Sequence, residues 1–207
     1  MGRYPDDWLI LAGDIGETPE QLRQCIEELA PRFKQLVWVP GNHELYTTSK
    51  DPCQLRGVSR YEYLVDLCRQ LGILTPEDPY AVWPGSGPPT VIIPTFLLYD
   101  YTFGPDGYTP IQSIEWAREA GLVASDERFI DSSPFPTKEA WCAHRVQLTI
   151  KRIQTEVPAG HQVVLINHYP LRRDLVRLFR IPRYKIWCGT RETEDWHTDF
   201  PISVVVN

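Results

Sequence analysis

Residues 36–44 read LVWVPGNHE, and this stretch decides the fold class. Its first five residues form a short apolar run, which predicts a buried strand. The next residues place an amide, an imidazole and a carboxylate on the turn after that strand, in Asn42, His43 and Glu44. Open α/β sheets bind their ligands in the crevice at the carboxyl ends of the strands. The stretch therefore predicts a functional site at one end of an α/β sheet.

Two other apolar runs end in a similar polar turn. Residues 8–12 lead into Gly13 and Asp14, and residues 162–166 lead into Asn167 and His168. Each feature taken alone fits an ordinary turn or a core histidine. Oxygen and imidazole ligands together at three strand ends favour a metal site, and they suit Mn, Fe or Zn better than Mg or Ca.

The composition is typical of a soluble globular protein, and 207 residues are enough for one domain with a sizeable core. The formal net charge of −6 argues against a general binder of nucleic acid or anionic membranes. No stretch is long enough to span a bilayer, and the N-terminus lacks the features of a signal peptide. The five cysteines are odd in number and form no C-x-x-C pair, so we expect reduced, mostly buried thiols in a cytoplasmic protein.

Capping signals predict three long helices between the strands. Thr18, followed by a proline and by a glutamine three residues on, opens the first helix, and Pro31 ends it. A second capping box is predicted at Ser59, with Gly72 as the stop signal. Thr137 caps the third helix, which should run to about residue 157. Because the helices lie between strands, parallel β-α-β units are expected.

The rest of the chain predicts two more strands and one long irregular stretch. The strands are expected at residues 90–96 and 202–206. Residues 104–136 are rich in proline and glycine and contain one short helix, at about residues 111–120. A loop of this length inside a compact domain usually carries function, so we expect it to shape the entrance of the site.

The strand-end motifs Gly13-Asp14, Gly41-Asn42-His43-Glu44 and Asn167-His168-Tyr169-Pro170 resemble, in this order, those of the calcineurin-like metallophosphoesterases. The resemblance extends from about residue 8 to the end of the chain. It implies a two-sheet α/β/β/α sandwich over residues 1–207, as a single and partial domain. It also implies hydrolysis of a phosphoester by hydroxide that two divalent metal ions activate.

The resemblance also implies a role for each site residue. Asp14 would bridge the two metal ions, and Asn42 and His168 would bind the second ion. His43 would face the substrate phosphate and stabilise or protonate the leaving oxygen, and Glu17 would orient His43. Two cations about 3.5–4 Å apart clamp the attacking and leaving oxygens of an in-line displacement. Glu44 is given no metal role.

Two motifs of the family are missing from this sequence. No Asp-x-His precedes Asp14, and the chain stops after Asn207, where the resemblance would place Gly-His-x-His. The first metal ion would keep only Asp14, and the second would lack a histidine. We therefore expect an internal fragment of a longer enzyme, with weak metal binding and low or no turnover.

A locally basic segment follows His168 and contains Arg172 and Arg173. These two side chains would bind or steer an anionic phosphate substrate. The competing interpretation, which we favour, is a solvated amphipathic face with apolar residues packed inward, namely Leu175, Val176, Leu178 and Phe179. The aromatic residues between 99 and 108 would line either a substrate cleft or, as is more common, the core.

We therefore predict a metal-dependent phosphoester hydrolase that uses Mn, Fe or Zn. The alternative is a degenerate member of the fold that binds a protein partner and catalyses nothing. Loss of two ligand motifs fits such a scaffold, whereas retention of Asp14, Asn42, His43 and His168 speaks against it. A nuclease of the same fold is a third possibility, and the acidic net charge argues against it.

Overall fold

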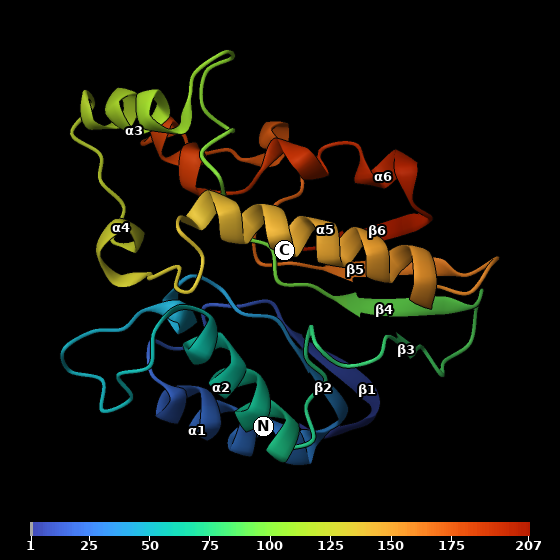
Figure 1. Cartoon of the computed structure of the whole chain (residues 1–207). Helices are drawn as coiled ribbons and strands as arrows, with labels where there is room; N and C mark the ends of the chain where they lie inside the picture. The colour runs from blue at the N-terminus through green and yellow to red at the C-terminus, as the bar shows by residue number, and fades with distance from the viewer. Residues whose placement is uncertain (1) are drawn as a thin grey trace.

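The computed structural model describes residues 2–207 and contains two sheets with helices packed along them (Figure 1). β1 (Tyr4–Leu11) and β2 (Phe33–Trp38) pair in parallel as a two-stranded sheet. The second sheet has the order β3-β4-β5-β6, in strands Ala81–Val82, Thr90–Pro94, Gln162–Ile166 and Ile202–Val206. β3 is antiparallel to β4, whereas β4, β5 and β6 are parallel. The predicted α/β class with two sheets is confirmed.

Three long helices lie along these sheets. In Figure 1, α1 (Pro19–Leu29) and α2 (Gly57–Gln70) accompany the two-stranded sheet, and α5 (Lys138–Glu156) runs along the four-stranded one. The short helices α3 (Pro110–Arg118) and α4 (Asp126–Phe129) lie at one end of the molecule. The remaining helical segments are α6 (Trp196–Asp199) and the 3-10 turns η1 (Ala30–Arg32), η2 (His43–Leu45), η3 (Arg173–Leu175), η4 (Pro182–Trp187) and η5 (Arg191–Thr193).

Two of the three predicted helix starts are confirmed. The Thr18 hydroxyl accepts from the N–H of Gln21, whose side chain accepts in return from the Thr18 N–H, and Thr137 caps α5. The predicted cap at Ser59 is wrong, because the cap position is three residues earlier, at Arg56, and α2 begins at Gly57. A tertiary contact replaces the side-chain cap there: the N–H of the second helical residue donates to the carbonyl of Ser133 at 2.9 Å. Helix termini need such acceptors, but a distant carbonyl leaves no local sequence signal.

The core holds the strand ends together. Trp38 of β2, Ile93 of β4 and Trp141 of α5 are fully buried in one large cluster. A smaller cluster joins Val37 and Val39, in and just after β2, to apolar residues of β4 and β5. Because β2, β4 and β5 share these contacts, the turns that follow the strands are fixed relative to one another. Because a close-packed core is hardly compressible, it allows little relative movement of these turns.

Two expectations about the whole chain have different outcomes. Among the described residues, every helix is too short or too polar to cross a bilayer. The five cysteines are free, as expected, but only Cys68 and Cys142 are buried. The prediction that most of the thiols are buried is therefore wrong, because Cys25, Cys53 and Cys188 lie at partly exposed positions.

Candidate metal and phosphoester site

The three predicted metal ligands converge at the carboxyl ends of β1, β2 and β5. The Nε2 atom of His168 lies 3.2 Å from Oδ1 of Asn42 and 3.6 Å from Oδ2 of Asp14. Ligand atoms about 2.1 Å from a cation, at tetrahedral or octahedral angles, lie about 3.0–3.4 Å from one another. The 3.2 Å distance falls in this range and the 3.6 Å distance lies just above it, so a small inward shift of Asp14 would let the three side chains share one divalent cation.

His168 is held through its Nδ1 atom, with its Nε2 atom facing Asn42 and Asp14. Its Nδ1 lies 2.9 Å from the carbonyl oxygen of Ala12, an atom that can only accept. The proton therefore resides on Nδ1, and Nε2 keeps its lone pair for a ligand. Asn167, which is buried, fixes the same turn, since its Nδ2 donates to the carbonyl of Tyr169 and its Oδ1 accepts from the N–H of Leu97.

Asn42 is oriented by a buried acid that the sequence analysis missed. Its Nδ2 donates to Oδ1 of Asp126 at 3.0 Å and to the hydroxyl of Tyr46 at 3.1 Å. The Tyr46 hydroxyl in turn donates to Asp126 at 2.6 Å. Both amide hydrogens are thereby used, so Oδ1 faces His168. Asp126 lies 84 residues away from Asn42 in the chain, at the start of α4, and no local pattern connects the two.

Glycines allow the first and second turns to touch. Asp14 has a φ of +56°, in the left-handed region that residues other than glycine rarely adopt, and Gly13 has a φ of +91°. A Cβ atom on Gly13 would lie 2.6 Å from Nδ1 of His168, and one on Gly41 would lie 2.6 Å from the N atom of Asp14. Both positions therefore require glycine, which explains the glycine of each motif in physical terms.

Glu44 binds the backbone of the first and second turns. Its carboxylate is almost fully buried and accepts from the N–H groups of Asp14, Ile15 and Gly41 at 2.9, 2.6 and 2.9 Å. Burial raises the pKa of Glu44, and these backbone donors oppose that shift. The side chain thus joins the first turn to the second.

Arg60 extends the same scaffold to a third loop. It is fully buried on α2 and pairs with the carboxylate of Asp51 at 2.7 Å. It also donates to the carbonyl oxygens of Glu44 and Glu17, at 2.7 and 2.9 Å. Sequence reasoning placed Arg60 only within the predicted capping box at Ser59. Charged residues are almost never fully buried unless they are paired, and nothing in the sequence identifies Asp51 as the partner.

His43 and Glu17 form a hydrogen-bonded pair beside the ligands. The Nδ1 atom of His43 lies 3.0 Å from Oε1 of Glu17, and both side chains are about half exposed. The His43 N–H donates to Oδ1 of Asp14 at 3.1 Å. A carboxylate on Nδ1 fixes the ring and leaves Nε2 as the nitrogen that can exchange a proton with a bound molecule.

The candidate ligands and His43, but not Glu17, line an open cavity of about 390 Å³. The lining also includes apolar side chains, namely Leu175, Val176, Leu178 and Trp187. Arg177 is the arginine that lines this cavity, together with Asp14, Asn42, His43 and His168. The cavity thus combines the candidate metal ligands with apolar lining residues.

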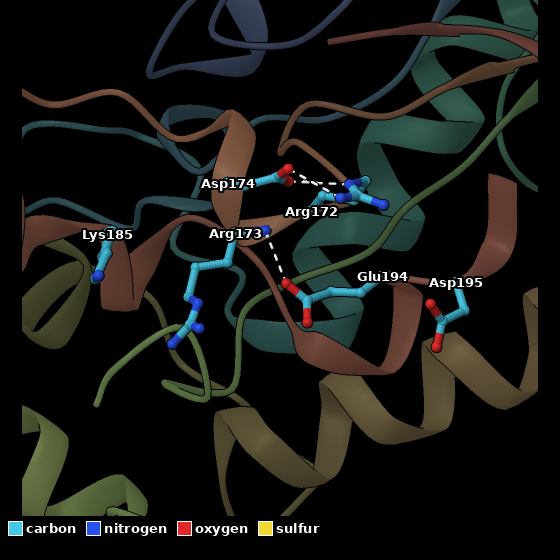
Figure 2. A pocket seen from close by; sticks show the side chains of 6 residues that line it. All are labelled: Arg172, Arg173, Asp174, Lys185, Glu194 and Asp195. Carbon is cyan, nitrogen blue, oxygen red and sulfur yellow. Dashed lines mark hydrogen bonds and ion pairs between the residues drawn. The ribbon is translucent and has the colours of Figure 1, made fainter. Parts of the chain in front are cut away.

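Arg172 and Arg173, the predicted substrate-binding residues, line a neighbouring pocket instead (Figure 2). Figure 2 shows the Arg172 guanidinium paired with Asp174, at 2.9 Å. Arg173 pairs with Asp106 at 3.0 Å. Both cations are thus balanced by a carboxylate within the chain, and phosphate binding by them remains a prediction.

The favoured inward packing of the apolar residues in this segment is wrong for Leu175 and Phe179, whereas Val176 and Leu178 are partly buried. Leu175 is 52% exposed and Phe179 is 90% exposed. The segment is not one amphipathic helix, because it runs through the short 3-10 turns η3 and η4. Tyr99, Tyr101 and Phe103 lie in the core, as the common pattern predicts.

The donor set tests whether a transition metal fits. Among the described residues, no group of three or more His, Cys, Asp and Glu side chains lies close enough to hold a metal ion, so the third ligand here is the amide of Asn42. One carboxylate, one amide oxygen and one imidazole of fixed tautomer suit Mn, Fe or Zn. These residues therefore fit a divalent cation at Asp14, Asn42 and His168.

Comparison with known proteins identifies the family of this chain. Residues 2–207 match the family model described as calcineurin-like phosphoesterase. The chain is 44% identical over 197 residues to the [acyl-carrier-protein] phosphodiesterase PptH of Mycobacterium tuberculosis, a match that covers 95% of this chain and 60% of the relative. The crystal structure of phosphopantetheinyl hydrolase (PptH) from the same organism superimposes with a TM-score of 0.91 at 43% identity, over 97% of this chain and 71% of that one. The chain therefore belongs to the calcineurin-like phosphoesterase family.

Proposed function

We propose that this protein is a metal-dependent phosphodiesterase that removes phosphopantetheine from an acyl carrier protein. The convergence of Asp14, Asn42 and His168 on one point, beside the His43–Glu17 pair, carries the proposal. The 44% identity to a relative described as an acyl-carrier-protein phosphodiesterase supports the substrate class. Free cysteines support a cytoplasmic location.

Each residue has a stated task in this proposal. Asp14, Asn42 and His168 hold divalent cations, with Mn, Fe or Zn as the candidates. The cations, when bound, supply Lewis acidity toward the phosphate and activation of water. His43, oriented by Glu17, holds a proton at Nε2 and gives it to the leaving oxygen of the carrier protein as its bond to phosphorus breaks. The apolar lining residues of the cavity accommodate the organic arm of the substrate.

The test uses phosphopantetheinylated acyl carrier protein and Mn²⁺, with release of the arm measured by intact mass. Asn42→Ala should lower both metal content and turnover. His43→Ala should lower kcat by about 100-fold or more while metal content is unchanged. Glu17→Gln should act in the same direction as His43→Ala, but more weakly, because it only positions the ring.

The alternative of a non-catalytic scaffold predicts a different result. A scaffold would release no phosphopantetheine at any Mn²⁺ concentration, and Asn42→Ala and His43→Ala would then be indistinguishable from the parent protein. That outcome, in a longer chain that also supplies the two missing ligand motifs, would exclude the phosphodiesterase assignment.

A further inference from the structure

Residues 175–181, here called the entrance segment, connect η3 to η4 and carry two arginines, five apolar residues and no acid. The surrounding residues 172–185 contain six of the chain's 21 basic residues and one of its 27 acidic residues. The whole chain is acidic, with a formal net charge of −6. The segment is thus a basic and apolar site on an acidic molecule.

The side chains of the entrance segment are largely without partners inside the protein. Phe179 is 90% exposed, Leu175 is 52% exposed and Ile181 is 39% exposed. Of the basic residues around it, Arg172, Arg173 and Arg183 pair with carboxylates.

Arg177 and Arg180 are both exposed, and neither has a hydrogen-bond or ion-pair partner within residues 2–207. An almost fully exposed phenylalanine between unpaired arginines has the composition of a binding hot spot.

The entrance segment is continuous with the candidate site. Leu175, Val176, Arg177 and Leu178 line the cavity that also contains Asn42 and His168. Phe179 and Arg180 follow directly and do not belong to that lining. When a molecule inserts a phosphodiester into the cavity, the part of it that stays outside would therefore contact Phe179 and Arg180.

We propose that the entrance segment docks an acidic face of the carrier protein, so that the enzyme recognises its substrate as a protein as well as a phosphodiester. This inference rests on the proposed function. The occupant is assigned by charge: most of the enzyme surface repels an acidic protein, whereas Arg177 and Arg180 attract it. The exposed Phe179 supplies apolar contact area at the centre of that attraction. Docking there would orient the attached arm toward the cavity.

The test measures binding without turnover. Fluorescently labelled phosphopantetheinylated acyl carrier protein is titrated with the purified protein in EDTA, and the dissociation constant is read from anisotropy. Phe179→Ser and Arg180→Glu should each weaken binding by about fivefold or more. Added NaCl should weaken binding of the parent protein and have much less effect on Arg180→Glu.

Matched controls lie elsewhere on the surface. Ile111→Ser removes an exposed apolar side chain from α3, and Lys34→Glu reverses an exposed charge at the opposite end of β2 from Asn42. Both should bind the carrier protein within about twofold of the parent. Because Phe179 and Arg180 are exposed, their variants should melt at the parent temperature and hydrolyse the small diester bis(p-nitrophenyl) phosphate at the parent rate.

The outcomes separate this inference from the proposed function. Equal binding by Phe179→Ser, Arg180→Glu and the parent protein would overturn the docking surface. Binding of anionic vesicles instead of the carrier protein, lost in Phe179→Ser, would overturn it in favour of a membrane contact. Selective loss of carrier-protein binding would support the surface even if Mn²⁺ produced no release of the arm, in which case only the proposed activity would fail.

Discussion

Arg60 is the buried cation that joins the loops of the candidate site, and Arg60→Met tests how much the protein depends on it. Methionine replaces the long aliphatic part of the arginine side chain but has none of the hydrogen-bond donors of the guanidinium. The carbonyls of Glu17 and Glu44 lose a charged donor, and Asp51, whose side chain is 1% exposed, loses its cation. Asp51 keeps only the N–H of Cys53, at 2.8 Å.

The expected cost follows from this loss of pairing. Removing one partner of a buried ion pair costs about 3–5 kcal/mol, because the other charge is left uncompensated. We expect the free energy of unfolding to fall by about 4 kcal/mol. For a protein of this length, such a loss lowers the melting temperature by about 8–16 °C. Urea unfolding followed by tryptophan fluorescence, and thermal unfolding followed by circular dichroism, measure the two quantities.

A control on the same helix separates burial from charge. Arg69 pairs with Asp78 at 2.8 Å, but its side chain is 42% exposed. Arg69→Met should therefore cost no more than about 1 kcal/mol. Adding Asp51→Leu to Arg60→Met should recover at least half of the lost stability, because no unpaired buried charge then remains.

Two results would refute this reasoning. One is an Arg60→Met variant that is no less stable than Arg69→Met, which would mean that water or a rearranged side chain solvates the carboxylate. The other is a double variant with Asp51→Leu that is as unstable as Arg60→Met, which would place the cost in packing and not in charge.

Three further predictions concern single positions. Gly41→Ala should displace Asp14, because the new Cβ would lie 2.6 Å from the Asp14 N atom. Calorimetry should show that the affinity for Mn²⁺ falls by about tenfold or more. Ile93→Ala, at a fully buried position of β4, should lower the unfolding free energy by about 2–5 kcal/mol, measured in urea. Burial opposes ionisation of Glu77, but Arg145, 2.7 Å away, holds its pKa below the ordinary value. The stability that this pair contributes is therefore present above the unfolded pKa of about 4.3 and is lost as the pH falls through the lower folded pKa. Glu77→Gln should make the free energy of unfolding depend less on pH in the acid range. An unchanged acid profile in this variant would contradict the assignment.

Local signals were sufficient at the start of the first and third long helices, where the capping residue and its partner are close in sequence. The cap of α1 was predictable because Thr18 and Gln21 are three residues apart. The candidate ligands were predictable because each directly follows an apolar strand. Asp126 and Arg60 were not, because their partners at the site come from loops distant in the chain and the contacts form only in the folded protein. Sequence reasoning thus identified the side chains that converge at the candidate site and missed those that hold them in place.

The prediction that Leu175 and Phe179 pack inward failed for a different reason, and their exposure supports the docking proposal. The apolar residues there suggested inward packing, because burying such side chains is favourable by about 1.5–3 kcal/mol each. The structure leaves Phe179 and Leu175 exposed beside a polar cavity, without that stabilisation. Local rules fail most often at sites under functional constraint, where stability is exchanged for binding. A partner that covers Phe179 would restore the lost burial, so the carrier-protein titration with Phe179→Ser measures whether this exposure serves recognition.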